Sequence, residues 1–354
     1  GAADELEPHR QLSQYVADKW QLQQGLPNEK IHALARTADG YLWIGTLEGL
    51  ARFDGVRFTV FDRSNNPEMS SAHVSALLVD RNGRLWVGTQ IGLMYLQDGR
   101  LRMYTGMQGL ANAEVHSLTE DKDGRLWVGT RSGLFRTGGD AQALFTASDG
   151  LGDANIHVTH QDREGVLWVA TQSAGLRRHN GERFVAHAQL PAGDPVRAIH
   201  EDKDGTMWVG TEGGRLYRGS RGNFSVATSS LGAVRAITRD SNDNLWITTF
   251  RGGLVRYNRG GFSTLEAERL PHTELSALFE DPEGTLWVGT RGGGLMRLRD
   301  GKFLSFGAAE GLPDDMVWAV SPARGGGLWI GSDAGVARMR FSGASPSSGQ
   351  FEDV

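Results

Sequence analysis

The chain has 354 residues, of which 49 are glycine and none is cysteine, and its formal net charge is -5 at pH 7. Its basic residues are scattered, so it lacks the basic stripe that neutralises phosphates, and nucleic acid is not expected as a partner. The lack of cysteine excludes disulfides, thiol nucleophiles and thiolate metal sites without fixing the compartment. No run of 18 or more apolar residues occurs, so contact with a membrane is expected only through flanking segments that are missing here.

Residues 1–10 are polar and are expected to form a disordered chain end. After them, one short phrase recurs eight times: a turn, Leu or Met, Trp, Val or Ile, a small residue, and Thr or Ser. The repeat length is about 40 residues, which is typical of a propeller blade. The tryptophans that mark the repeats are Trp43, Trp86, Trp127, Trp168, Trp208, Trp246, Trp287 and Trp329.

Each repeat contains signals for four strands. In the third repeat, residues 115–118 alternate as an innermost strand, and the turn from Asp121 to Gly124 follows, with an Asp to accept turn N–H groups and a Gly for positive φ. The Trp strand, a Gly-rich turn and two further strands complete the unit. We therefore predict an all-β fold over residues 11–341, a single eight-bladed β-propeller with four antiparallel strands per blade, with a seven-bladed arrangement as the alternative.

The ends of the chain bear on how the ring closes. Residues 15–21 precede Gly25-Leu26-Pro27 just as residues 303–306 precede Gly311-Leu312-Pro313, so we expect an N-terminal strand to complete the last blade. Residues 350–354 are the alternative fourth strand for the last repeat. Otherwise, residues 342–354 are expected to be a flexible tail or the start of a linker to a missing domain.

The repeat resembles that of the two-component regulator propeller family. The residues that carry the resemblance are Gly25-Leu26-Pro27, the run from Asp39 to Thr46, and Gly49-Leu50. The resemblance spans about residues 11–341. It implies a periplasmic sensor of an inner-membrane receptor, usually followed by a β-sandwich, a transmembrane helix and a histidine kinase or diguanylate cyclase. It also suggests carbohydrates or other nutrients as ligands, without assigning ligand residues.

Candidate ligand-binding residues are those that differ between repeats at equivalent positions near the mouth of the central channel. Two positions matter: the residue after the first apolar residue of the innermost strand, and the residue after the Thr of the Trp strand. The candidates are His32, His116, His157, Arg197, Arg235, Trp318, Arg131, Gln172, Phe250 and Arg291. Arginines offer bidentate donors and aromatic rings stack on sugars, so this set suits an anionic metabolite or an oligosaccharide.

Other interpretations of the same residues remain open. The polar side chains could hydrate the channel or pair with acids of adjacent blades. A metal site built from the histidines is not expected, because equivalent positions on different blades are too far apart to converge easily. The Asp turns lack the spacing of a calcium loop and are interpreted as turn chemistry.

No linear motif of a hydrolase, metalloprotease or phosphate loop is present. We therefore expect no catalytic residues and no cofactor. The family resemblance implies a sensor module that binds its ligand without chemistry. The alternatives are a propeller enzyme of the lyase or glycosidase type, and a scaffold for protein binding or for homodimerisation within a full receptor.

Overall fold

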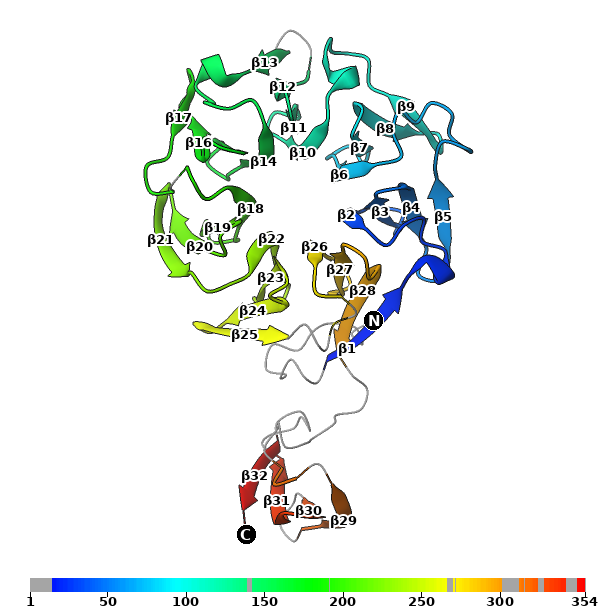
Figure 1. The fold of residues 1–354 in the computed structure, drawn as a ribbon, viewed down its shortest axis with the longest axis vertical. Coiled ribbons are helices and arrows are strands. Elements are labelled where there is room, and N and C mark those ends of the chain that lie inside the picture. Colours follow the sequence, from blue (N-terminus) through cyan, green and yellow to red (C-terminus); the bar gives the residue numbers. More distant parts are fainter. Residues whose placement is uncertain are drawn as a thin grey trace.

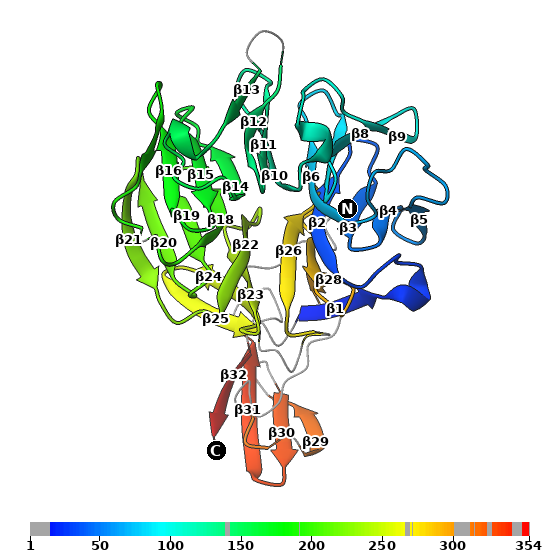
Figure 2. The same ribbon diagram turned by 45° about the horizontal axis from the view of Figure 1, so that its top comes forward.

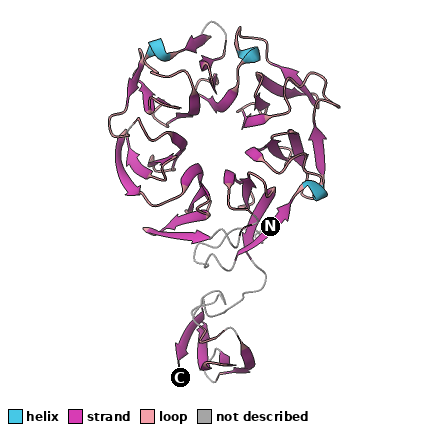
Figure 3. Ribbon diagram, in the orientation of Figure 1, coloured by secondary structure: helices cyan, strands magenta, loops and turns pink. Residues whose placement is uncertain are grey.

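The computed structural model describes residues 15–138, 142–190, 192–265, 270, 272–300, 312–314, 316–323, 328–341 and 349–353. Its strands form eight four-stranded antiparallel sheets, and three short 3-10 turns are its only helices within these residues (Figure 3). The predicted all-β propeller is thus confirmed. No helix among these residues has the length and hydropathy needed to cross a membrane.

Six sheets each use four consecutive strands, from the innermost to the outermost. Their strands are β2 (Ile31–Arg36), β3 (Leu42–Thr46), β4 (Gly49–Phe53) and β5 (Phe58–Phe61); β6 (Val74–Val79), β7 (Leu85–Thr89), β8 (Leu93–Gln97) and β9 (Arg100–Met103); β10 (Val115–Glu120), β11 (Leu126–Thr130), β12 (Gly133–Arg136) and β13 (Ala143–Phe145); β14 (Ile156–Gln161), β15 (Leu167–Thr171), β16 (Leu176–His179) and β17 (Phe184–Ala186); β18 (Val196–Glu201), β19 (Met207–Thr211), β20 (Leu216–Ser220) and β21 (Asn223–Thr228); and β22 (Ala233–Arg239), β23 (Leu245–Phe250), β24 (Leu254–Asn258) and β25 (Gly261–Leu265).

Two sheets are built differently. The seventh contains β26 (Leu275–Glu280), β27 (Leu286–Thr290), β28 (Leu295–Asp300) and, on its outer edge, the N-terminal strand β1 (Tyr15–Trp20). The eighth contains β29 (Val317–Pro322), β30 (Leu328–Ser332), β31 (Gly335–Phe341) and β32 (Gly349–Asp353). The 3-10 turns are η2 (Leu22–Gln24), η3 (Leu110–Asn112) and η5 (Ala147–Asp149).

The ring closes between the seventh sheet and the first, where β26 packs against β2 (Figure 1). Ser276 Oγ donates to the carbonyl oxygen of Ile31 at 2.5 Å across this seam. The same contact joins neighbouring sheets inside the ring, where Ser75 Oγ donates to the carbonyl oxygen of Val115 at 2.5 Å. The seam therefore has the geometry of an ordinary interface between blades.

The N-terminal strand reinforces the seam. Strand β1 pairs with β28, from Tyr15 opposite Asp300 to Trp20 opposite Leu295. The Trp20 ring lies 5.5 Å from the Trp287 ring of the seventh sheet and 5.2 Å from the Phe53 ring of the first sheet. One indole thus joins both sides of the closure.

These contacts correct the expected eight-bladed ring and the expected role of the N-terminal strand. The strand completes the seventh repeat rather than the eighth, and Figures 1 and 2 show β29–β32 outside the ring. The tail supplies the last strand of the eighth sheet, because Gln350 pairs with Arg340. The physical reason is edge pairing: the N-terminal strand takes the free edge of β28, and the free edge of β31 is taken by the nearest following segment. Residues 303–306, expected as the fourth strand of the seventh repeat, lie outside the described residues.

Glycine in the Trp strand allows close packing between sheets. A Cβ added to Gly88 would lie 2.5 Å from Val115 Cγ1, and one added to Gly289 would lie 2.6 Å from Ile31 Cγ2 across the seam. A real side chain cannot approach so closely, so the glycine leaves room for the β-branched residue that opens the next innermost strand.

Each tryptophan of the ring is tied to its own turn. Trp127 donates its indole N–H to Asp121 Oδ2 at 2.9 Å, while Asp121 Oδ1 accepts the N–H groups of Asp123 and Arg125, both at 2.9 Å. The same indole bond occurs in five other repeats, and Thr37 replaces the Asp in the first. One carboxylate thus closes the turn and satisfies a buried donor.

Candidate functional site

The two candidate positions of each repeat meet at one end of the innermost strands. Because the first two strands of a sheet are antiparallel, Val115 lies opposite Thr130, and the N–H of Arg131 donates to the carbonyl oxygen of Glu114 at 3.0 Å. We call these two positions, together with the residue before each innermost strand, the inner rim. The innermost strands surround the ring axis (Figure 1), so the inner rim encircles that axis.

The centre of the candidate site is a clamp of two arginines on one carboxylate. Arg235 donates from Nη1 and Nη2 to the two oxygens of Glu212 at 2.8 and 2.9 Å, and Arg197 Nε donates to Glu212 Oε2 at 2.7 Å. Partial burial opposes ionisation of Glu212, but the two guanidinium groups hold its pKa below the usual range. The clamp keeps one positive charge in excess.

Arg197 extends the clamp to the fourth sheet. Its Nη1 lies 2.6 Å from His157 Nδ1, and its Nη2 donates to Gln172 Oε1 at 3.2 Å. Burial, together with the positive charge of Arg197, lowers the pKa of His157 to about 4. His157 is therefore neutral at pH 7, and Nδ1 can accept the bond from the arginine.

A stack of two imidazoles continues the inner rim into the third sheet. The rings of His116 and His157 are 5.2 Å apart and inclined by 14°. His116 Nε2 lies 3.4 Å from Glu114 Oε1, and Arg131 Nη1 lies 3.3 Å from Glu114 Oε2. Glu114 thus connects two candidates that the sequence placed at different positions of one repeat.

On its other side the clamp meets an aromatic ring. The guanidinium carbon of Arg235 lies 5.3 Å from the centre of the Phe250 ring, and that of Arg251 lies 5.1 Å from it. Arg251 also pairs with Glu274 at 3.3 Å. The ring face is therefore flanked by cations, which favours a cation–π arrangement.

Two further candidates lie at the seam. His32 and His73 have ring centres 4.8 Å apart, and Lys30 forms an isolated β-bridge with Arg291 of the seventh sheet. Burial first, then the positive charges of His73, Arg291 and Lys30, lower the pKa of His32 to about 4.

Nine of the ten candidates from the sequence lie on the inner rim, and the tenth, Trp318, lies elsewhere. Trp318 lies on β29, outside the ring, where its side chain is 71% exposed and its indole N–H contacts Asp333 Oδ1 at 2.5 Å. It cannot act together with the others at the channel mouth, because the eighth repeat is not a blade of this ring. The nine on the rim are His32, His116, His157, Arg197, Arg235, Arg131, Gln172, Phe250 and Arg291.

Sequence reasoning missed the residues that immediately precede the innermost strands. At this position Glu114 pairs with Arg131 of the rim, Glu274 pairs with Arg251 beside it, and His73 stacks on His32. Comparing the repeats one residue earlier would have found them. With them included, basic side chains still outnumber acidic ones on the inner rim: Lys30, Arg131, Arg197, Arg235 and Arg291 against Glu114, Glu212 and Glu274.

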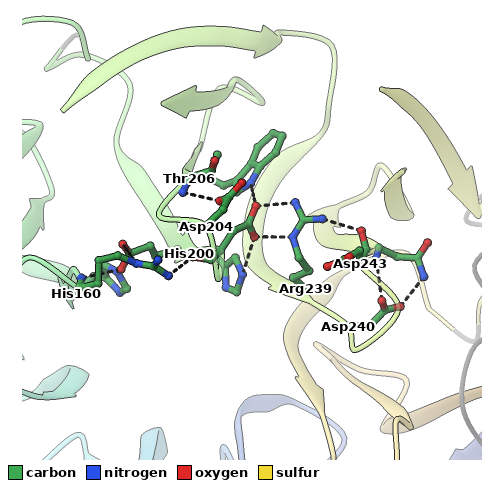
Figure 4. A network of polar contacts seen from close by, with 12 residues as sticks. His160, His200, Asp204, Thr206, Arg239, Asp240 and Asp243 are labelled. Atoms are coloured by element: carbon green, nitrogen blue, oxygen red, sulfur yellow. Dashed lines mark hydrogen bonds and ion pairs between the residues drawn. The ribbon is translucent and has the colours of Figure 1, made fainter. Parts of the chain in front are cut away.

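The opposite face of the ring carries a structural network, shown in Figure 4. Arg239 donates from Nε and Nη2 to both oxygens of Asp202 at 2.6 Å, which joins the sixth sheet to the fifth. Burial acts to raise the pKa of Asp202, but bonds from His200, Arg239 and Trp208 hold it well below its usual range. The partners in this network belong to turns and strand ends of neighbouring sheets, so the network fastens these blades together.

No group of three or more His, Cys, Asp or Glu side chains within the described part of the chain is arranged to hold a metal ion. What the inner rim offers instead is convergent guanidinium groups, neutral imidazoles and one aromatic face. Such an arrangement can hold a carboxylate or a hydroxyl-rich molecule by directed hydrogen bonds.

The fold is that of a β-propeller with a polar rim around its axis. The model of the two component regulator propeller family matches five segments of the chain, residues 25–48, 68–90, 109–132, 189–213 and 269–292. The expected family resemblance is thereby confirmed. No curated protein sequence matches the chain.

Solved structures share this fold. The extracellular domain of a hybrid two component system from B. thetaiotaomicron matches with a TM-score of 0.78 and 21% identity over 92% of this chain and 48% of its own. That of a one component system from the same organism matches with a TM-score of 0.69 and 20% identity over 95% and 47%. This chain therefore spans about half the length of these domains.

An enzyme has a similar ring. A virginiamycin B lyase from Staphylococcus aureus matches with a TM-score of 0.65 and 16% identity over 80% of this chain and 99% of its own. At these identities each likeness shows the fold alone.

Proposed function

We propose that this ring is the ligand-sensing module of a bacterial membrane signalling receptor, and that it binds a small anionic metabolite or oligosaccharide at the inner rim without chemical change. The observation that carries the proposal is the clamp of Arg197 and Arg235 on Glu212 beside Phe250. Two guanidinium groups already hold one carboxylate there, and the basic excess of the rim favours a second anion.

The family repeats and the extracellular domains with the same fold support an extracytoplasmic location. We place the module in the periplasm, as part of an inner-membrane protein whose output is a histidine kinase or a diguanylate cyclase. In this proposal the catalytic step belongs to that output domain, and ligand binding on the ring is passed on through the membrane-anchored receptor, which could act as a homodimer.

The test is binding followed by thermal unfolding, with uronic-acid and neutral oligosaccharides as probes. A ligand that binds only the folded ring raises the melting temperature in a saturable way. We expect an Arg197→Ala, Arg235→Ala double variant to lose the shift. As a matched control, Arg102→Ala on the outer strand β9 should retain it, because Arg102 pairs with Glu68 away from the rim. Full binding by the double variant would overturn the rim assignment.

A second candidate is a propeller lyase. It is favoured by His116, which lies 3.4 Å from the Glu114 carboxylate on the rim, a pairing suited to acid–base chemistry. Mass spectrometry after incubation with the bound ligand separates the two functions. A sensor returns its ligand unchanged, whereas a lyase releases a product.

A further inference from the structure

A contact between the turn that follows one innermost strand and the next sheet recurs around the ring. The residue after the first turn residue donates its backbone N–H to the side chain that ends the next innermost strand. At three interfaces of the described chain that side chain is a glutamate: Arg81 N donates to Glu120 at 2.8 Å, Arg163 N to Glu201 at 2.9 Å and Ser241 N to Glu280 at 2.7 Å. Both arginines also form an ion pair with their glutamate, so the carboxylate neutralises the cation of the turn.

The interface between the third and fourth sheets departs from this pattern. Here Lys122 N donates to Gln161 Oε1 at 2.6 Å, so an amide replaces the carboxylate. Gln161 ends β14 just as Glu120 ends β10. The amide satisfies the N–H of the turn, but it carries no charge. Within the described part of the chain, no acid forms an ion pair with Lys122.

A groove of about 490 Å³ opens at this interface, on the face opposite the inner rim. Lys122 lies across it, because a Cβ added to Gly165 in the turn of the fourth sheet would be 3.3 Å from Lys122 Nζ. Arg178 on β16 lines the groove from the fourth sheet, and Arg136 on β12 lines it from the third. The guanidinium carbon of Arg136 is 5.3 Å from the centre of the Trp127 ring. Basic side chains from two sheets therefore line one groove.

The acids of the groove are engaged elsewhere. Asp121 accepts the indole N–H of Trp127 and two N–H groups of its own turn. Asp123 pairs with Arg125 at 2.6 Å. Glu164 pairs with Arg221 at 3.0 Å. The described residues place none of these carboxylates in an ion pair with Lys122 or Arg178.

The next interface shows that a groove alone does not create this charge. A groove of about 390 Å³ lies between the fourth and fifth sheets, and its acidic residues outnumber its basic ones: Asp162, Glu164, Glu201 and Asp204 against Arg163 and Arg221. Arg163 pairs there with Glu201, and Arg221 with Glu164. The exchange of Glu for Gln161 is what distinguishes the groove of the third and fourth sheets.

We propose that the groove between the third and fourth sheets is a second ligand site, which takes a small molecule bearing an oxyanion group such as a phosphate, sulfate or carboxylate. The oxyanion lies beside Lys122 and Arg178, where it supplies the charge that a glutamate supplies at other interfaces. The volume is within the range of about 300–1,000 Å³ that small-molecule sites occupy, so the groove has room for more than a bare ion. This inference does not depend on the proposed ligand site at the inner rim.

The experiment is a titration of residues 1–354 with inorganic phosphate, sulfate or acetate at constant ionic strength, followed by the NMR signals of the Lys122 and Gly165 amides. We expect saturable shifts of both signals with at least one of the three anions. The Arg197→Ala, Arg235→Ala double variant should show the same shifts, because its substitutions lie on the opposite face.

Gln161→Glu is the sharpest variant, because it restores the carboxylate found at the other interfaces. It should weaken anion binding by about fivefold or more while keeping the fold. The matched control, Gln97→Glu, makes the same charge change at an exposed position of β8 that does not line the groove, and it should leave binding intact. Lys122→Gln should also weaken binding, whereas Lys203→Gln, at the equivalent turn position of the fifth sheet, should not.

Saturable shifts that survive the substitutions on the rim and are weakened by Gln161→Glu support the proposal. Shifts that grow without saturation overturn it, because they indicate an adventitious ion only. Equal weakening by Gln97→Glu overturns it as well, since the effect is then one of net charge. Loss of the shifts in the double variant assigns the anion to the inner rim and also overturns the second site.

Discussion

Trp208 donates its indole N–H to Asp202 Oδ2 at 2.8 Å, and the same carboxylate receives both arms of Arg239 from the next sheet. A residue that closes a turn within one blade therefore also fastens that blade to its neighbour. The relationship gives the Asp that recurs at this turn a structural role.

Replacing Asp202 by Ala should destabilise the ring by about 3–5 kcal/mol, because it leaves Arg239 unpaired and a buried indole N–H without its acceptor. Urea unfolding followed by tryptophan fluorescence measures the loss. Asp204→Ala in the same turn is the control, since Asp204 is exposed and bonds to Thr206, whose N–H donates to Asp204 Oδ1 at 2.8 Å. Equal losses in the two variants would show that the carboxylate of Asp202 has no special role.

Acid should weaken the ring before carboxylates titrate. The pKa values of His32 and His157 are lowered to about 4 in the folded protein. The folded protein therefore favours the neutral form of each imidazole more than the unfolded chain does. The contribution of these histidines to the free energy of unfolding is complete above about pH 6.5, the pKa of histidine in the unfolded chain. This contribution is lost as the pH falls toward 4. We expect a loss on the order of 2–3 kcal/mol per histidine between pH 7 and pH 4. Unfolding measured at several pH values should show that the free energy of unfolding falls less steeply with decreasing pH in His157→Asn. An unchanged pH dependence would contradict the role of His157.

Close packing at the seam can be tested with one methyl group. Gly289→Ala places a Cβ 2.6 Å from Ile31 Cγ2 and should cost about 1–3 kcal/mol through overpacking. Gly331→Ala is the matched control in the eighth sheet, where the nearest atom is 3.8 Å away, and it should change the stability little. If the eighth sheet belonged in the ring, both substitutions would be costly.

Glu212 occupies the two arginines of the clamp, so it competes with any anionic ligand. Glu212→Gln removes the negative charge and should strengthen binding of a carboxylate probe by several fold, while leaving a neutral probe unaffected. Calorimetric titration of both probes checks this prediction. Weaker carboxylate binding would mean that Glu212 itself holds the ligand.

The strand pattern, the Asp turns and the positions of the rim residues could be predicted because the same sequence signals recur from repeat to repeat. The partners of those residues could not be predicted in full, since Glu114 and Glu274 lie one residue before the strands that were compared. Arg197 and Arg235 were expected to face a ligand, and in the structure both pair with Glu212.

The preferred count of eight blades was wrong, and the alternative of seven describes the ring. The eighth repeat has the same Trp phrase as the others, so nothing local in it distinguishes a blade of this ring from a separate sheet. Closure depends on which free edge the N-terminal strand takes, and β28 and β31 present similar edges. That choice is a contact between residues more than 270 apart in the chain, as in the ion pair of Asp18 with Arg297.

Cysteine pairing tests this closure most directly, because residues 1–354 contain no cysteine. Asp18 lies opposite Arg297 in the β1–β28 ladder, where Cα atoms of facing residues are about 4.5–5.5 Å apart, a separation that a disulfide can span. The account predicts that Asp18→Cys with Arg297→Cys forms an intramolecular disulfide on mild oxidation, and that Asp18→Cys with Arg338→Cys, the equivalent residue of the eighth repeat, does not. The reverse result would contradict a ring of seven blades closed by the N-terminal strand.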